Sequence, residues 1–187
     1  MAITRITSPA ITGLTIPNTS INNASLNSVT ALPSAISTGI TSAQQWNFSS
    51  DISTGSAVIF TSNWSSPSGN LVGQAMTQSS GIFTFPSTGV YLITGSINTR
   101  NSDSAQDVQF NIYTSNNNFT SQAITGAGTH RYSIASKNYQ ITARTLFDVT
   151  DLSNDKVKFG ASGYGGTSVF RGGTDQNMFT FIRLGDT

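Results

Sequence analysis

Residues 81–93 contain two short runs of alternating apolar residues, separated by the sequence Pro-Ser-Thr-Gly. Side chains alternate between the two faces of a strand, so Phe83 and Phe85 share one face of the first run. Pro86 cannot donate to a strand ladder and Gly89 readily takes a positive φ, which favours a turn between the runs. The segment therefore predicts two β-strands joined by a chemically specified corner.

The composition extends this β prediction to the whole chain. Only 9% of the 187 residues are charged and glutamate is absent, whereas Ser, Thr, Asn and Gly supply most polar positions. Ser, Thr and Asn compete for backbone hydrogen bonds, and Gly costs about 1 kcal/mol in a helix interior. We expect strands at about residues 56–60, 81–85, 89–98, 107–114, 129–135, 139–149, 155–161 and 177–184. Their number and spacing are typical of an all-β antiparallel sandwich or jelly roll.

The first 45 residues differ in character from the rest. No charged residue occurs between Arg5 and Asp51, and single Ile, Leu and Val residues recur between polar spacers and prolines. We interpret residues 1–45 as an extended N-terminal arm and residues 46–187 as one head domain. A disordered tail is the alternative. The lack of charge and the regular apolar positions favour an arm that docks on another protein or braids with its own copies.

Three motifs in the head carry a family resemblance. The pattern F-x-x-P-x-x-G-x-Y at residues 83–91 is similar to the central motif of the globular head of complement component one, subcomponent q. Residues 146–157 resemble that family's penultimate hairpin, where an acidic turn precedes a strand. Residues 168–170 and 178–184 look like its closing S-x-F and final strand. Over about residues 46–187 the resemblance implies a tumour necrosis factor-like jelly roll that assembles as a trimer.

The predicted final strand is largely apolar on both faces, so both faces require cover. The sandwich core covers one of them. Subunits around a threefold axis, which the resemblance implies, would cover the second, and the chain's own arm or a loop is the alternative. We expect the homotrimer to form through four side chains: Phe179, Phe181, Ile182 and Tyr91.

Residues with catalytic or metal-binding chemistry are few. The chain lacks cysteine, which excludes disulfides and thiolate metal sites. His130 is the only histidine, and we interpret it as a surface residue at a strand end. Asp148, Asp151 and Asp155 cluster and could bind calcium, but their spacing lacks the glycine of a calcium loop and favours an Asx-rich turn. We expect no catalytic residue, cofactor or resident metal, and a polysaccharide hydrolase is disfavoured because paired carboxylates are scarce.

Polar loops on a rigid sandwich are the candidates for recognition. The loop at residues 111–122 and the glycine-rich loop before Phe170 supply four candidates: Asn116, Asn117, Phe119 and Tyr164. A net charge of +1 with scattered basic residues argues against nucleic acid. No window resembles a signal peptide or a membrane span.

The opening Met-Ala-Ile-Thr-Arg-Ile-Thr-Ser and residues 31–36 resemble the N-terminal ends of surface proteins of tailed bacteriophages. This resemblance predicts a non-enzymatic protein on the exterior of a virion, namely a homotrimeric capsid decoration, or cement, protein. Its arm would bind the major capsid protein or another virion protein. The alternative is a trimeric tail-fibre or spike head that binds a host-surface receptor or glycan. The residues expected to anchor the arm are Ile3, Ile6, Ile11, Leu14 and Ile16.

Overall fold

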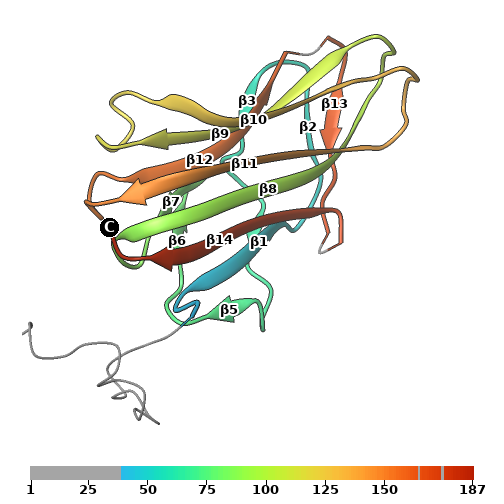
Figure 1. Ribbon diagram of the computed structural model, residues 1–187. Helices are drawn as coiled ribbons and strands as arrows, with labels where there is room; N and C mark the ends of the chain where they lie inside the picture. The colour runs from blue at the N-terminus through green and yellow to red at the C-terminus, as the bar shows by residue number, and fades with distance from the viewer. Residues whose placement is uncertain (1–38, 164, 174) are drawn as a thin grey trace, which may run out of the picture. The chain divides into compact units, whose positions relative to one another are not determined.

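The described part of the chain is an antiparallel β-sandwich of two sheets (Figure 1). The structure, a computed structural model, describes residues 39–187 except residues 164 and 174. All regular elements within these residues are β-strands. The all-β prediction from the helix-disfavouring composition is therefore confirmed for this part of the chain.

The first sheet has eight strands in the order β2-β13-β8-β14-β1-β4, with β11 paired to β8 and β5 paired to β1. Its strands are β1 (Ala43–Phe48), β2 (Ile52–Thr54), β4 (Trp64–Ser65), β5 (Leu71–Val72), β8 (Gly89–Asn101), β11 (Tyr139–Val149), β13 (Ser168–Phe170) and β14 (Asn177–Gly185). The second sheet has six strands in the order β10-β9-β12-β7-β6, with β3 paired to β12. Its strands are β3 (Val58–Ile59), β6 (Thr77–Ser79), β7 (Ile82–Thr84), β9 (Asp107–Ser115), β10 (Ala123–Arg131) and β12 (Lys156–Ser162).

The predicted turn at residues 86–89 carries the chain from the second sheet to the first. Phe83 lies on β7, which pairs with β12, whereas β8 begins at Gly89 and pairs with β11 and β14. Gly89 has a φ of +137°, and a Cβ at this position would overlap the backbone of β14. The Tyr91 hydroxyl donates to the Ser87 carbonyl at 2.9 Å. Glycine and tyrosine at these two positions therefore fix the corner between the sheets.

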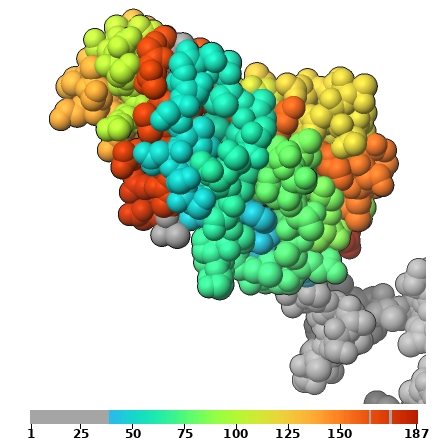
Figure 2. All heavy atoms as spheres, turned by 180° about the vertical axis from the view of Figure 1, so that it is seen from behind, coloured from blue at the N-terminus to red at the C-terminus, as the bar shows by residue number. Residues whose placement is uncertain are grey.

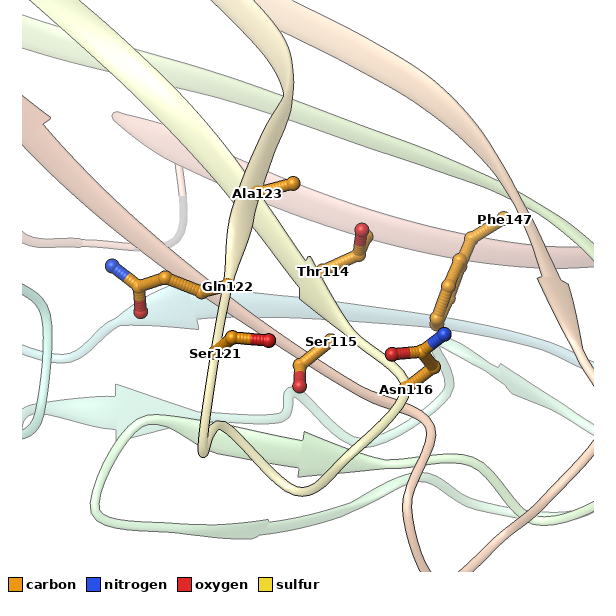
Figure 3. A pocket seen from close by; sticks show the side chains of 7 residues that line it. All are labelled: Thr114, Ser115, Asn116, Ser121, Gln122, Ala123 and Phe147. Carbon is orange, nitrogen blue, oxygen red and sulfur yellow. The ribbon is translucent and has the colours of Figure 1, made fainter.

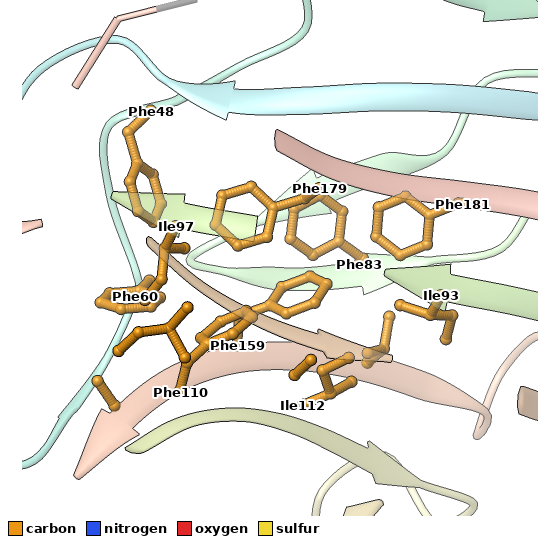
Figure 4. Packing of buried hydrophobic residues seen from close by; sticks show 14 of the residues in the cluster. Phe48, Phe60, Phe83, Ile93, Ile97, Phe110, Ile112, Phe159, Phe179 and Phe181 are labelled. Carbon is orange, nitrogen blue, oxygen red and sulfur yellow. The ribbon is translucent and has the colours of Figure 1, made fainter. Parts of the chain in front are cut away.

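Aromatic side chains from both sheets fill the space between them (Figure 4). Phe83 and Phe85 are both buried, as their shared strand face predicts. The ring of Phe179 lies at the centre, with the ring centroids of Phe48, Trp64 and Phe159 at 4.7 to 5.0 Å. Aromatic side chains bury about 150–250 Å² each, so this cluster supplies much of the apolar burial. Its eight fully buried phenylalanines are Phe48, Phe60, Phe83, Phe110, Phe159, Phe170, Phe179 and Phe181.

The segment from β2 to β6 joins the two sheets along one edge. β4 pairs with β1 of the first sheet, and β3 pairs with β12 of the second. In Figure 2 this cyan and teal segment runs as a continuous band over one face of the head. The Trp64 indole donates to the Phe60 carbonyl at 2.9 Å, and the Phe60 ring packs on Phe48 at 5.0 Å. The segment therefore closes the aromatic core at this edge.

The other edge closes where β10 lies against β11. A Cβ on Gly126 or Gly128 of β10 would overlap the backbone carbonyls of Arg144 and Thr142 on β11. Glycine therefore permits an approach of the two backbones that other residues would prevent. β10 begins earlier than the strand predicted at residues 129–135, because glycine weakens the strand signal in this part of the sequence.

Candidate assembly face and loop pocket

β14 presents different side chains to the two sides of the first sheet. Phe179 and Phe181 point into the core and are 0% and 1% exposed, and Tyr91 on the neighbouring β8 is 1% exposed. All three rings pack against other core aromatics of the same chain. The sequence-based assignment of these three residues to a subunit interface is therefore wrong, because the sandwich itself covers them. Ile182 faces the opposite side and is half-buried.

One apolar row crosses the outer face of the first sheet. Strand register places Leu146, Leu92, Ile182, Ala43 and Val72 in a single line across β11, β8, β14, β1 and β5. Directly paired residues carry their side chains on the same face of a sheet. Leu146 is 62% exposed and Val72 is 52% exposed. These five residues, called the outer apolar row below, form a continuous apolar strip that faces away from the core.

Polar side chains border the outer apolar row on one side. The next cross-strand row consists of Arg144, Thr94, Thr180 and Gln45. Beyond it, the hydroxyls of Ser96 and Thr142 are hydrogen-bonded at 3.1 Å. At the β5 end of the outer apolar row, Leu71, Val72 and Ile182 contribute to a pocket of about 250 Å³. The outer face therefore combines the apolar row with polar side chains and with further exposed apolar residues of β14, namely Met178 and Leu184. Mixed apolar and polar surfaces of this kind are common in protein interfaces.

The turn between β9 and β10 is held together by its own polar side chains. Asn117 Oδ1 accepts from the Ser115 hydroxyl at 2.8 Å and from the Ser121 backbone N–H at 3.0 Å. Asn117 Nδ2 donates to the Ser121 hydroxyl at 2.7 Å. The Ser115 hydroxyl in turn accepts from the backbone N–H of Phe119 at 2.9 Å. Asn118 and Phe119 have positive φ values of 52° and 62°, so the network holds the turn in one strained conformation.

A pocket of about 260 Å³ opens beside this turn (Figure 3). It is lined by Thr114, Ser115, Asn116, Ser121, Gln122, Ala123 and Phe147. Phe147 comes from β11 and packs on the Phe85 ring at 5.8 Å. The pocket, called the loop pocket below, therefore combines one aromatic wall with uncharged amide and hydroxyl groups.

The four predicted recognition residues have different positions. Asn116 is exposed and lines the loop pocket, whereas Asn117 is engaged within the turn. The Lys158 ammonium lies 4.2 Å from the centroid of the Phe119 ring, and burial lowers the pKa of this lysine. Tyr164 lies outside the described residues. Among these four residues, Asn116 is therefore the one that the geometry favours for contact with a ligand.

The acidic turn between β11 and β12 uses its carboxylates within the turn. Asp155 is 2% exposed, and its Oδ2 accepts from the Asp151 backbone N–H at 2.8 Å. Hydrogen bonds from the Asn154 side chain and from the Ser153 backbone lower the pKa of Asp151. Asp148 lies on the exposed side of β11. Within residues 39–187, apart from 164 and 174, no group of three His, Cys, Asp or Glu side chains could hold a metal ion.

The one histidine belongs to an aromatic cluster near the end of β10. The His130 ring is stacked on Tyr139 with a centroid distance of 4.1 Å and meets Tyr132 edge-on at 5.6 Å. It is half-buried, with neighbouring exposed positions on both sides. These contacts give His130 a packing role at the strand end.

Comparisons with solved structures define the fold. Eiger, a tumour necrosis factor from S. frugiperda, superposes with a TM-score of 0.62 at 12% identity, over 78% of this chain and 93% of that chain. The fold is a tumour necrosis factor-like jelly roll. Murine APRIL matches at a TM-score of 0.58 and 10% identity, over 76% of this chain and 98% of that chain. PRD1 vertex protein P5 matches at a TM-score of 0.49 and 16% identity, over 78% and 99% of the two chains.

The sequence itself matches no protein-family model and no curated protein. At 10–12% identity, the structural likeness to Eiger and APRIL concerns the fold. It confirms the antiparallel jelly roll that the corner motif and the closing strand predict.

The predicted anchoring residues of the arm, Ile3, Ile6, Ile11, Leu14 and Ile16, lie outside the described residues, so their role remains a prediction. β1 begins at Ala43, slightly before the expected start of the head at residue 46. In the part of the chain that the structure covers, no helix has the length and hydrophobicity needed to cross a bilayer.

Sequence reasoning did not identify the residues that distinguish the two faces of β11. Leu146 belongs to the outer apolar row, and the adjacent Phe147 lines the loop pocket. Alternation along residues 139–149 contains this signal, because neighbouring side chains in a strand point to opposite faces. Which residues they meet depends on pairing with distant strands, and the sequence alone does not give that register.

Proposed function

We propose that this protein is a non-enzymatic structural protein on the exterior of a tailed-bacteriophage virion. Its head forms a homotrimer, and its N-terminal arm attaches the trimer to the major capsid protein as a decoration, or cement, protein. The observation that carries the assembly part of the proposal is the outer apolar row on the first sheet. The arm has Arg5 as its one charged side chain and resembles phage surface proteins, and both features support the virion assignment.

The outer apolar row has the dimensions of an interface core. Five strands at a spacing of about 4.8 Å make the row about 19 Å long. Leu146 and Val72, at its two ends, are both more than half exposed. Contiguous apolar strips rimmed by polar residues mark protein contacts in soluble proteins. A second and a third copy of the head would cover the row and remove its apolar surface from water.

A charge within the outer apolar row tests the assembly. We expect wild-type protein to sediment as a trimer in analytical ultracentrifugation, and Ile182→Asp or Leu146→Asp to sediment as a folded monomer. The matched control is Thr129→Asp, which adds the same charge at an exposed strand position of the second sheet. A monomeric wild type, or row variants that remain trimeric, would refute assembly through this face.

Copy number on purified particles tests the virion assignment. Quantitative mass spectrometry should give a copy number comparable with that of the major coat protein if the chain decorates the shell. Removal of residues 1–38, which leaves β1 intact, should abolish attachment to particles while the head keeps its circular dichroism spectrum. Absence from particles would contradict the virion assignment, and attachment without the arm would move the anchor to the head.

A further inference from the structure

The loop pocket lies beside the β9–β10 turn, between the start of β10 and the Phe147 side chain of β11. Gly126 and Gly128 bring β10 into close contact with the β11 backbone. Toward the turn, the register between β10 and β9 is interrupted between Ile124 and Gly126. Ala123 from β10 and Phe147 from β11 then line the two sides of the pocket. The hollow is therefore built by the strand frame and does not depend on the loop tip alone.

Three polar side chains at the pocket have free hydrogen-bonding capacity. Within the described residues, the side chains of Thr114, Asn116 and Gln122 make no hydrogen bond, although Thr114 is only 6% exposed. The Thr114 hydroxyl is not among the buried, unpartnered side-chain atoms of the described residues, so at the pocket wall it can bond water or a ligand. Amides and hydroxyls both donate and accept, which matches the hydroxyl groups of a sugar.

Phe147 supplies the apolar side of the pocket. It is half-buried and packs on Phe85. In the view of Figure 3, Phe147 and Asn116 lie on one side of the pocket, and Ser121 and Gln122 lie on the other. Ligand sites commonly pair an aromatic surface with a few placed polar groups. A sugar ring has an apolar C–H face and polar hydroxyl edges, so it can contact both sides at once.

The charge and the size of the pocket limit the kinds of ligand that it can bind. The seven lining residues are all uncharged, so the pocket offers no cation for a phosphate, a sulfate or an acidic sugar. Its volume of about 260 Å³ lies below the roughly 300–1,000 Å³ of pockets for drug-sized ligands. One sugar unit, presented alone or at the end of a glycan chain, is the ligand that suits this space.

The turn is rigid before any ligand arrives. The mutual hydrogen bonds of Ser115, Asn117 and Ser121 fix the backbone that carries Asn116 and Gln122. A preformed site loses little conformational entropy on binding. We propose that the loop pocket binds a neutral saccharide unit, with Phe147 against the sugar ring and with Thr114, Asn116 and Gln122 hydrogen-bonded to its hydroxyl groups.

Ligand-observed and protein-observed NMR on the full chain test this proposal. The probes are the methyl glycosides of glucose, galactose, mannose, rhamnose and N-acetylglucosamine, each at millimolar concentration. We expect saturation transfer to at least one of these sugars, and shifts of the Ala123 methyl and Gln122 amide resonances in labelled protein. If no sugar of the panel binds, or if the shifts lie elsewhere, the proposal is overturned.

Variants then separate pocket binding from general effects. The double variant Asn116→Ala with Gln122→Ala should weaken binding about tenfold or more, because each lost hydrogen bond contributes about 0.5–1.5 kcal/mol and about 1.4 kcal/mol corresponds to tenfold. Phe147→Leu keeps an apolar side chain and should also weaken binding. Gln140→Ala, on the opposite face of β11, is the control and should bind as the wild type does. Unchanged affinity in both pocket variants would refute the assignment.

The sugar test is separate from the test of assembly. Leu146 and Phe147 are neighbours on β11, yet they face opposite sides of the first sheet. A monomeric head would contradict the proposed trimer and still bind the sugar. A trimer without sugar binding would leave the assembly proposal in place and overturn only the pocket.

Discussion

Replacement of Phe179 by alanine tests whether this residue belongs to the core of one chain. Its side chain is 0% exposed, and the rings of Phe48, Trp64, Phe110 and Phe159 lie at 4.7 to 6.0 Å. Truncation of a buried phenylalanine lowers the free energy of unfolding by about 3–5 kcal/mol. We expect a loss of about 5 kcal/mol, because rings on several sides restrict collapse into the cavity. In a protein of this size, that loss lowers the Tm by about 10 to 20 °C.

Urea and thermal unfolding, followed by circular dichroism at two protein concentrations, measure this loss. The matched control is Met178→Ala, because Met178 is the preceding residue on β14, faces outward and is 48% exposed. The control should change the free energy of unfolding by about 0.5 kcal/mol or less. The core assignment is refuted if Phe179→Ala behaves like the control. It is also refuted if the loss depends on protein concentration, since a second subunit would then cover Phe179.

Two further substitutions test local packing and burial. Gly95→Ala places a Cβ against the Phe110 ring, and we expect urea unfolding to show a loss of about 1–3 kcal/mol; wild-type stability would mean that this ring moves freely. Burial raises the pKa of Tyr132 above 10.0, despite the hydrogen bond from its hydroxyl to Thr99. The protonated Tyr132 side chain therefore adds to the free energy of unfolding below pH 10, and this stabilisation is lost as the pH rises through the folded-state pKa. Tyr132→Phe should therefore flatten the loss of unfolding free energy measured above pH 10, and an unchanged alkaline slope would contradict this cause.

Local sequence chemistry predicted the corner between the sheets well. The positive φ of Gly89 is a short-range requirement that the sequence predicted. The hydrogen bond from the Tyr91 hydroxyl to the turn was not predicted, because Tyr91 was assigned to the subunit interface. The alternation of Phe83 and Phe85 also gave their common burial. The positive φ and this burial depend on residues within one short segment, so periodicity and turn propensity are sufficient to predict them.

The inner face of β14 could not be chosen from its sequence. Phe179 and Ile182 lie on opposite faces of a strand that is apolar on both faces. Alternation separates the two faces but does not indicate which of them points into the core. The choice depends on Phe48 and Phe159, which are distant in sequence and meet Phe179 only in the folded sandwich. The outer apolar row could not be predicted for the same reason, because Leu146 becomes part of a continuous strip only through pairing with distant strands.

Only some of the residues that line the loop pocket could be predicted from the sequence. Asn116 was identified from the polarity of its loop, whereas Phe147 lies on a distant strand that the fold brings beside it. β10 begins at Ala123, before the strand predicted at residues 129–135, because Gly126 and Gly128 weaken the strand signal there. Their actual role is to admit the β11 backbone, a tertiary requirement that overrides strand propensity.

The self-contained hydrogen bonding of the β9–β10 turn separates two kinds of mutational constraint. Ser115, Asn117 and Ser121 maintain the backbone, so changes there should alter the shape of the loop. Asn116 lies between Ser115 and Asn117 in the chain, and Gln122 follows Ser121. Both side chains are exposed. Selection can therefore exchange these two residues with little effect on folding. The head therefore carries two exposed positions on a hydrogen-bonded frame, an arrangement in which single substitutions would change the surface chemistry of the loop and leave its backbone in place.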